Sequence, residues 1–139
     1  MGTPFRLLEH TADIGFEARG ASLAELFANA GHALLEISID TSRVTHREKL
    51  AFDLQSDDLP SLLVDFLSEL LYLVDSGRHI PALIEVDEIS PTRLVARLSG
   101  EPRDLVRHPW KLIVKAITYH GLEISETDGA WRARVFVDI

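Results

Sequence analysis

The sequence contains no cysteine. Disulfide bonds, thiolate metal ligands and cysteine nucleophiles are therefore excluded, and the absence is consistent with an intracellular protein, for which we expect a cytoplasmic location. The first residues lack the apolar run of a signal peptide. No stretch approaches the roughly 18 consecutive apolar residues that a membrane-spanning helix needs, so we expect no membrane association.

Positive charge is also scarce. The chain carries 14 lysine and arginine residues against 22 aspartate and glutamate residues, which gives a formal net charge of −8. Proteins that bind RNA or DNA through the phosphate backbone are usually basic. The sequence therefore predicts no strong direct nucleic-acid binding, and a role in a nucleic-acid process would pass through a protein partner or a bound cation.

Several common catalytic signatures are missing too: the HExxH zinc motif, the Walker loop, the GxSxG elbow and the dinucleotide fingerprint. What remains is a chain of 139 residues that is 46% hydrophobic and 26% charged. These values are typical of a soluble globular protein, and the length suits one hydrophobic core. We expect a single domain over residues 1–139.

Two amphipathic helices stand out. Ser22 and Glu25 are predicted to form a capping box, in which the Ser22 hydroxyl accepts from the Glu25 amide and the Glu25 carboxylate accepts from the Ser22 amide. The helix that follows ends near Ser38. The second helix begins at an acidic pair followed by Pro60 and ends at Gly77. Apolar residues recur on one face of each helix: Leu23, Leu26, Phe27, Ala30, Leu34 and Ile37 in the first, and Leu59, Leu62, Leu63, Phe66, Leu67, Leu70, Leu71 and Val74 in the second.

The other segments alternate between apolar and polar residues, as strands do. An Asp128-Gly129 pair marks a tight hairpin before the last strand. Together these elements predict an α+β fold: a two-layer domain with a mostly antiparallel or mixed sheet and two amphipathic helices packed on it. Strands are predicted over residues 5–9, 16–19, 44–55, 80–88, 92–99, 111–120, 122–125 and 131–139.

The chain is predicted to stop inside a strand. Along residues 131–139 the apolar side chains alternate with polar ones to the last residue, so the α-carboxylate of Ile139 would lie beside the Asp138 carboxylate. Two adjacent anions on a rigid element are costly unless a cation, lysine or arginine joins them. In the plainer interpretation, Arg132 or Arg134 on the same strand side neutralises Asp138.

A second candidate site is the turn over residues 10–15, which places His10, Thr11 and Asp13 directly after a strand. Asp13 is either a metal ligand or general base, or else the acceptor of an ordinary Asx turn. If it joined Asp138 and the terminal carboxylate of Ile139, the three carboxylates would suit Ca²⁺ or Mg²⁺ and would suit Zn²⁺ poorly.

A third candidate is Lys115, which lies in an otherwise apolar segment. It either pairs with Glu69 or an aspartate, acts as a desolvated nucleophile, or guards an edge strand against sheet association. The histidines give weaker signals: His46 and His79 are predicted to be solvated, and His108 to lie in a loop.

Taken together, these segments resemble the archease family. The markers are the order, the spacing and the abrupt end of four segments, residues 9–15, 65–72, 115–120 and 128–139. The resemblance covers most of the chain. It implies a small α+β protein that is not an enzyme by itself but a cofactor of the RtcB-type RNA ligase, which joins tRNA halves in tRNA splicing. Archeases promote guanylylation of that ligase and its multiple turnover.

The resemblance also implies a divalent-cation site. The family's ligands fall on Asp13, Asp138 and Ile139, and Ca²⁺ is the expected ion, with Mg²⁺ or Mn²⁺ as alternatives. Lys115 matches a strand lysine expected to matter for activation. Further motif residues with less support are His10, Asp40, Glu69 and His120.

One residue departs from the family pattern, because Gly121 stands where a polar residue is expected. Two alternatives from other functional classes stay open: a stand-alone metal-dependent hydrolase that uses the same carboxylates, and a metal-free, chaperone-like binding domain.

Overall fold

The computed structural model describes residues 4–9, 13–104 and 106–139. In those residues no helix is long and apolar enough to cross a membrane. The elements, in chain order, are β1 (Phe5–Glu9), β2 (Asp13–Gly20), α1 (Leu23–Ser38), β3 (Glu48–Gln55), α2 (Leu59–Ser76), β4 (Ile80–Ser90), β5 (Arg93–Glu101), β6 (Ala116–Thr127) and β7 (Ala130–Asp138).

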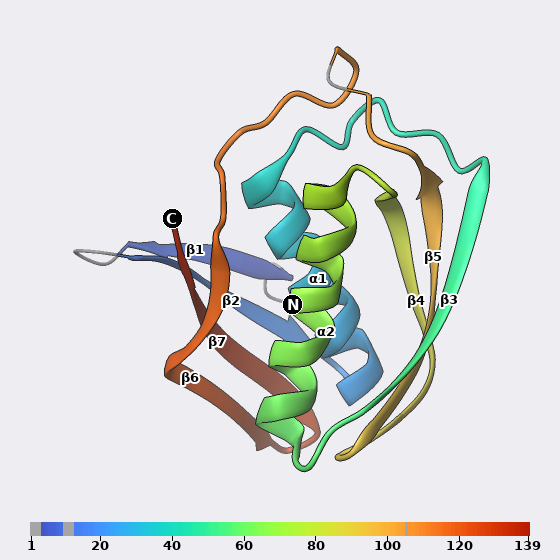
Figure 1. Ribbon diagram of the computed structural model, residues 1–139. Helices are drawn as coiled ribbons and strands as arrows, with labels where there is room; N and C mark the ends of the chain where they lie inside the picture. Colours follow the sequence, from blue (N-terminus) through green and yellow to red (C-terminus); the bar gives the residue numbers. More distant parts are fainter. Residues whose placement is uncertain (1–3, 10–12, 105) are drawn as a thin grey trace.

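The strands form two antiparallel sheets, one in the order β1-β2-β7-β6 and the other in the order β3-β5-β4. The two helices lie between the sheets (Figure 1). The predicted α+β class and both predicted helices are confirmed. The strands are divided between two sheets, whereas the sequence pattern predicted one sheet with both helices on it.

Burial of the helices explains the second sheet. In α1, residues outside the predicted apolar stripe are also buried, among them Ala33 and Leu35. In α2, Val64 and Leu73 widen the buried surface in the same way. A helix that is apolar over more than one stripe must be covered on more than one side. One core cluster accordingly includes side chains from both helices and both sheets.

The helix ends follow the sequence signals. The Ser22 hydroxyl accepts a hydrogen bond from the Glu25 amide at 3.1 Å, and the Glu25 carboxylate accepts one from the Ala21 amide at 3.2 Å. The capping box therefore closes on Ala21, one residue earlier than predicted. Asp58 caps α2 by accepting from the amide three residues later, at 2.8 Å. Gly77 ends α2 in the left-handed region with φ of 75°.

The strand predicted over residues 44–55 begins only at Glu48. The amide of Thr45 donates to the Glu101 carboxylate at 3.1 Å, and the amide of Val44 donates to the Thr41 carbonyl at 3.2 Å. These main-chain groups are bound outside the ladder, so the predicted start was wrong.

The strand predicted over residues 111–120 begins at Ala116. The amides of Lys111 and Leu112 donate to the Ser38 carbonyl at 3.1 and 3.4 Å. They satisfy the last carbonyl of α1, which would otherwise lack a partner. The apolar run of this segment packs against the end of a helix, so its first half is not a strand.

The last hairpin matches its prediction. Asp128 and Gly129 both have positive φ, 53° and 80°. In β7 the inner positions Ala133, Val135 and Val137 are fully buried. β7 ends at Asp138, however, and Ile139 lies beyond it with 47% of its surface exposed. The prediction of a strand to the final residue was therefore wrong by one position.

Candidate functional site

The two aspartates predicted as ligands occupy opposed positions in one sheet. Asp13 is the first residue of β2, Asp138 is the last of β7, and the two residues are direct partners in the antiparallel register. Opposed residues of an antiparallel pair have Cβ atoms about 4.5–5.5 Å apart. The fold thus brings two acidic positions from opposite ends of the chain together, next to the C terminus (Figure 1).

Asp138 is exposed, and no ion pair reaches its carboxylate from any residue that the structure describes. Arg134, which was one candidate to neutralise it, pairs with Glu123 at 3.0 Å instead. Arg132, the other candidate, makes no ion pair within the described ranges. The charge of Asp138 is therefore not compensated by either arginine of its own strand.

The main chain of Lys115 is hydrogen-bonded to the main chain of Asp138. Its amide donates to the Asp138 carbonyl at 2.8 Å, and the next residue, Ala116, is the β6 partner of Asp138. The Lys115 side chain is exposed and makes no ion pair with Glu69 or any other residue of the described chain. The alternatives of a desolvated lysine and of a pair with Glu69 were wrong, whereas a pair with Asp13 lies outside the described side chains. Its position at the start of an edge strand agrees with the alternative of an edge-guarding lysine.

The remaining predicted residues are spread over the fold. The amide and hydroxyl of Ser42 donate to Asp40 at 2.9 and 2.6 Å and lower the pKa of this carboxyl, so Asp40 closes its own turn. Glu69 is half-buried on α2, and His120 is exposed on β6. Across the described residues, no hydrogen bond or ion pair joins any of these three to Asp138. His10 lies outside the described residues.

The glycine that departed from the expected pattern has a structural reason. Gly121 has φ of 73°, and a Cβ atom there would lie 2.9 Å from the Phe136 ring. A Cβ at Gly15 would lie 2.7 Å from the same ring. The Phe136 ring thus rests against two glycines, and a polar side chain at position 121 would collide with it.

The three predicted ligands would suit a hard cation better than zinc. Two aspartates and a terminal carboxylate would offer only oxygen atoms, which Ca²⁺ and Mg²⁺ prefer. Among the described residues, no group of three histidine, aspartate or glutamate side chains could hold a metal ion. That statement does not extend to Asp13, whose side chain is outside the description.

Comparison with known proteins decides the family. Residues 5–139 match the archease protein family (MTH1598/TM1083). The chain belongs to the archease family. The protein archease of Methanosarcina mazei is 42% identical over 99% of this chain and 97% of its own length. The protein archease of Aeropyrum pernix is 38% identical, with 94% of each chain covered.

Solved structures agree with this family and with the fold. Protein 1598 of Methanobacterium thermoautotrophicum is similar, with a TM-score of 0.80, 36% identity and coverage of 98% of this chain and 99% of the other. An archease from Thermotoga maritima, described as a possible chaperone, has a TM-score of 0.63 over 100% of this chain and 98% of its own. At 21% identity, that likeness concerns the fold alone.

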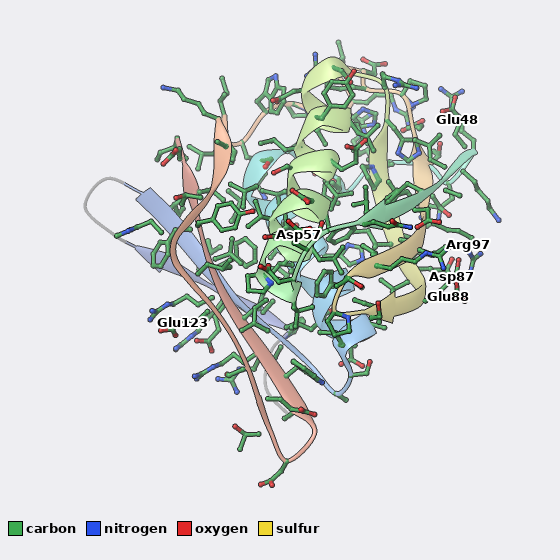
Figure 2. All side chains as sticks on the ribbon, turned by 60° about the horizontal axis from the view of Figure 1, so that its bottom comes forward. Glu48, Asp57, Asp87, Glu88, Arg97 and Glu123 are labelled. Carbon is green, nitrogen blue, oxygen red and sulfur yellow. The ribbon has the colours of Figure 1, made fainter. Side chains whose placement is uncertain are left out.

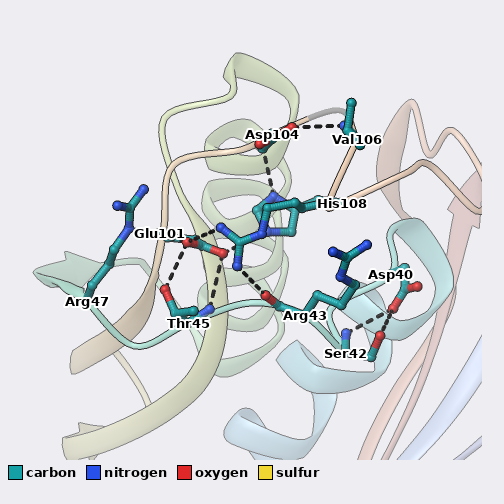
Figure 3. A network of polar contacts seen from close by, with 10 residues as sticks. Asp40, Ser42, Arg43, Thr45, Arg47, Glu101, Asp104, Val106 and His108 are labelled. Carbon is teal, nitrogen blue, oxygen red and sulfur yellow. Dashed lines mark hydrogen bonds and ion pairs between the residues drawn. The ribbon is translucent and has the colours of Figure 1, made fainter.

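Elsewhere in this archease-family fold lies a polar network that the sequence did not reveal (Figure 3). The Glu101 side chain is fully buried. It accepts hydrogen bonds from the amide and hydroxyl of Thr45 at 3.1 and 2.9 Å, from Arg107 at 3.1 Å and from His108 at 2.9 Å, and Arg47 lies 3.3 Å away. Burial raises the pKa of Glu101, but these donors outweigh it and lower the pKa to about 2.

The network joins two loops. The Asp104 amide donates to Nδ1 of His108, so Nε2 carries the proton that is donated to Glu101. His108 is thereby held in one tautomer and is fully buried. The sequence signal was the run of arginine and histidine after an apolar strand, but spacing alone did not identify the carboxylate that they surround.

His79 contradicts its prediction, because it is fully buried and not solvated. Neither ring nitrogen has a hydrogen-bond partner of ordinary geometry among the residues described. Burial lowers the pKa of His79, against a weaker opposing effect of Glu48. The neutral imidazole therefore belongs to the packed end of β4 and is no candidate for surface chemistry.

Proposed function

We propose that this chain activates an RtcB-type RNA ligase by promoting its guanylylation and multiple turnover in tRNA splicing, without being an enzyme itself. The observation that carries the proposal is the direct register of Asp13 with Asp138 beside the chain end, in a member of the archease family. A pair of acidic positions at one sheet end, where no described arginine forms an ion pair with Asp138, suits a cation site.

In this proposal Asp13, Asp138 and the α-carboxylate of Ile139 hold a divalent cation. Ca²⁺ is the first expectation, and Mg²⁺ and Mn²⁺ are the alternatives. When bound, the cation would supply positive charge to the phosphate oxygens of the nucleotide that the ligase uses. The protein's part is to place three oxygen donors on the ends of two paired strands, where the sheet holds the backbone still.

Lys115 would act beside this site. The main-chain bond between the two residues holds the backbone of Lys115 beside that of Asp138, and the side chain of Lys115 is exposed. A lysine is a strongly hydrated point charge that suits phosphate oxygens, so its role would be to attract and orient the nucleotide phosphates. His10, Asp40, Glu69 and His120 are secondary candidates for activation.

The surroundings suit a protein partner. Three large apolar side chains of this region are exposed: Ile113 by 61%, Tyr119 by 57% and Ile139 by 47%. Ile113 precedes Lys115 by two residues and Tyr119 follows it by four. Ile139 follows Asp138, whose carbonyl accepts the hydrogen bond from the Lys115 amide. Exposed apolar residues near a functional site often take part in protein contact. The net charge of −8 favours a basic partner surface, and the partner ligase would be met in the cytoplasm.

The test is to mix the chain with an RtcB-type ligase, GTP and Mn²⁺ and to measure the guanylylated fraction of the ligase over time. We expect a higher fraction, and repeated ligation per ligase molecule, with the chain than without it. Equal fractions would contradict the proposal. Hydrolysis of a phosphoester by the chain alone would favour the stand-alone metal-dependent hydrolase instead.

A chaperone-like role is the second candidate, because the similar Thermotoga maritima structure is described as a possible chaperone. It predicts protection of a partner from aggregation that persists in a chelator. The proposed activator predicts loss of its effect when the divalent cation is removed. Ligase guanylylation and light scattering, each measured with and without chelator, distinguish the two.

A further inference from the structure

Strand β3 forms one edge of its sheet. In the order β3-β5-β4 it pairs with β5 alone, and its register runs without a shift from Glu48 to Gln55. Figure 1 shows β3 at the right-hand margin of the molecule, with no helix or strand beyond it. An edge strand presents main-chain N–H and C=O groups that lack partners within the sheet, and these groups can pair with another chain.

The other edge strands are interrupted or short. β4 carries two register shifts and Pro81, which has no N–H to donate. It also carries the acidic residues Asp87 and Glu88, which lie close together in Figure 2. β6 has a register shift between Thr118 and Glu123, and β1 has only five residues. Among the described strands, β3 is therefore the long and regular edge.

The hydrogen-bond pattern shows which residues of β3 face the free edge. Just past the strand end, the amide of Ser56 donates to the Thr92 carbonyl at 2.9 Å, in the same register as the β3–β5 ladder. In an antiparallel pair, hydrogen-bonded positions alternate with positions that do not bond to that partner. Counting back from Ser56, the even-numbered residues bond to β5. The main-chain groups of Lys49, Ala51 and Asp53 therefore point away from it.

The inner side of β3 is apolar and incompletely covered. Leu50, Phe52 and Leu54 pack against the core, and the ring centroids of Phe52 and Phe66 of α2 lie 5.9 Å apart. The three β3 side chains are only partly buried. A strand added beyond β3 would bury more of their surface, and burial of apolar surface favours association.

The outer side of β3 carries one charge of each sign. Lys49 is exposed and makes no hydrogen bond or ion pair with any residue that the structure describes. Asp53 is 49% exposed and accepts two hydrogen bonds from Arg93, at 3.0 and 2.7 Å. A carboxylate has about four acceptor sites, so Asp53 can accept from a further cation. Ala51, which is small and uncharged, lies midway between the two charged residues.

We propose that two copies of this chain pair through β3, antiparallel and centred on Ala51. Lys49 of each copy then lies opposite Asp53 of the other. The main-chain groups at these positions face the free edge, so each pair exchanges two hydrogen bonds. Opposite charges directly across a strand pair attract. On the inner side, Leu50 of each copy lies opposite Phe52 of the other. The same patch serves both copies, as a twofold axis requires.

In a plainer interpretation, Lys49 guards the edge, because lysines on edge strands commonly oppose pairing. Centring the pair on either neighbour of Ala51 would indeed set Lys49 opposite Gln55 or opposite Ala51. The register centred on Ala51 sets it opposite Asp53, and the charge that opposes the other two registers then favours this one.

The expected dimer is weak. A single pair of short strands covers less surface than the roughly 1,200 Å² of a stable interface. The net charge of −8 on each copy also opposes association. The proposal does not depend on the proposed ligase activation, because Asp138 belongs to the other sheet and pairing through β3 does not use that surface.

Sedimentation equilibrium of the full chain tests the association. We expect the average mass to rise with concentration from that of one chain toward that of two. A parent chain that stays monomeric up to about 1 mM would overturn the proposal and would leave this edge to a strand of a different protein.

Ala51→Pro tests whether the contact is made by β3. It removes an N–H at the centre of the proposed pair and leaves the ladder to β5 intact, since proline is tolerated where the N–H faces away from the sheet. The variant should keep the circular dichroism of the parent and stay monomeric. A dimer of Ala51→Pro as stable as that of the parent would overturn the proposal.

Exchanged charges test the register. Lys49→Asp alone sets two aspartates opposite each other, and Asp53→Lys alone sets two lysines opposite each other, so each variant should associate several-fold more weakly than the parent. An equimolar mixture should restore association, because every charged pair is then opposite in sign. Lys111→Asp is the matched control for Lys49→Asp: it changes the net charge equally, lies outside β3 and should dimerise like the parent.

Two results of this exchange would overturn the proposal. One is association of Lys49→Asp as strong as that of Lys111→Asp. The other is a mixture that associates no more strongly than its two components, when circular dichroism shows that both are folded.

Discussion

Asp13 lies directly opposite Asp138 in the antiparallel pair of β2 and β7, one residue before the end of the chain. The pairing is a consequence of topology, since β2 and β7 are neighbours at the centre of a four-stranded sheet. It gives the last residues a fixed backbone position, whereas chain ends are commonly frayed. The proposed cation site depends on this pairing.

Extension of the chain by one glycine tests the terminal carboxylate. The peptide bond would turn the Ile139 carboxylate into a neutral amide and move the negative charge about 3.3 Å outward. We expect Ca²⁺ affinity to fall by roughly tenfold or more, because the charge and number of ligands set calcium affinity. Titration calorimetry measures this, and an unchanged melting temperature would show that the fold is intact.

Ile139→Val is the control for that extension, since it changes the side chain and keeps the carboxylate. It should bind Ca²⁺ like the parent chain. If the extended chain also binds Ca²⁺ with the parent affinity, the terminal carboxylate is not a ligand.

Lys115→Met separates activation from metal binding. The ammonium group is no ligand, so Ca²⁺ affinity should be unchanged, while guanylylation of the ligase should fall several-fold for lack of a charge near the nucleotide phosphates. Lys111→Met is the matched control, because Lys111 pairs with Glu36 at 3.1 Å, away from Asp138. Full activation by Lys115→Met would remove this lysine from the mechanism.

Gly121→Ala should destabilise the fold more than Gly129→Ala. Both glycines have positive φ, 73° and 80°, so both substitutions introduce backbone strain of about 1–2 kcal/mol. Only at Gly121 would the new methyl group meet Phe136, and overpacking adds about 1–3 kcal/mol. Urea denaturation measures the two free energies of unfolding. Equal losses would show that the ring moves aside freely.

Glu101 predicts a particular dependence of stability on pH. Its pKa is about 2 in the folded chain against an ordinary value of 4.5, so the unfolded chain binds more protons between these values. The stabilisation is complete above about pH 4.5 and is lost as the pH falls toward 2. In Glu101→Gln, stability at neutral pH should be lower and the decline over that range shallower.

Denaturation at a series of pH values measures both effects. Glu36→Gln is the control, because Glu36 is 57% exposed in a surface ion pair and should change the profile little. A Glu101→Gln profile parallel to that of the parent would show that other carboxylates cause the acid sensitivity.

Local signals in the sequence predicted the elements well where the chain satisfies its own hydrogen bonds. Ser22 and Glu25, Asp58 and Gly77 bound the helices as their chemistry requires. The errors lie where distant residues provide the partner. Thr45 is bound by Glu101, and Lys111 by the end of α1, so two segments with a strand pattern are not strands there.

In the candidate site, too, local residue types were predictable from the sequence, whereas contacts between distant residues were not. The residue types at positions 13 and 138 suggested a cation site, but only the strand order brings the two positions together. Glu101 and His79 went unrecognised because a buried polar residue has no periodic signature of its own, and its burial depends on which loops pack over it.

The guanylylated fraction of an RtcB-type ligase in the presence of Asp138→Asn tests the central claim most directly. Asp57→Asn is the matched control, because Asp57 is likewise exposed but lies two residues before α2 (Figure 2). The account predicts that Asp138→Asn leaves the ligase at the level seen without the chain, while Asp57→Asn activates it fully. Full activation by Asp138→Asn would contradict the account.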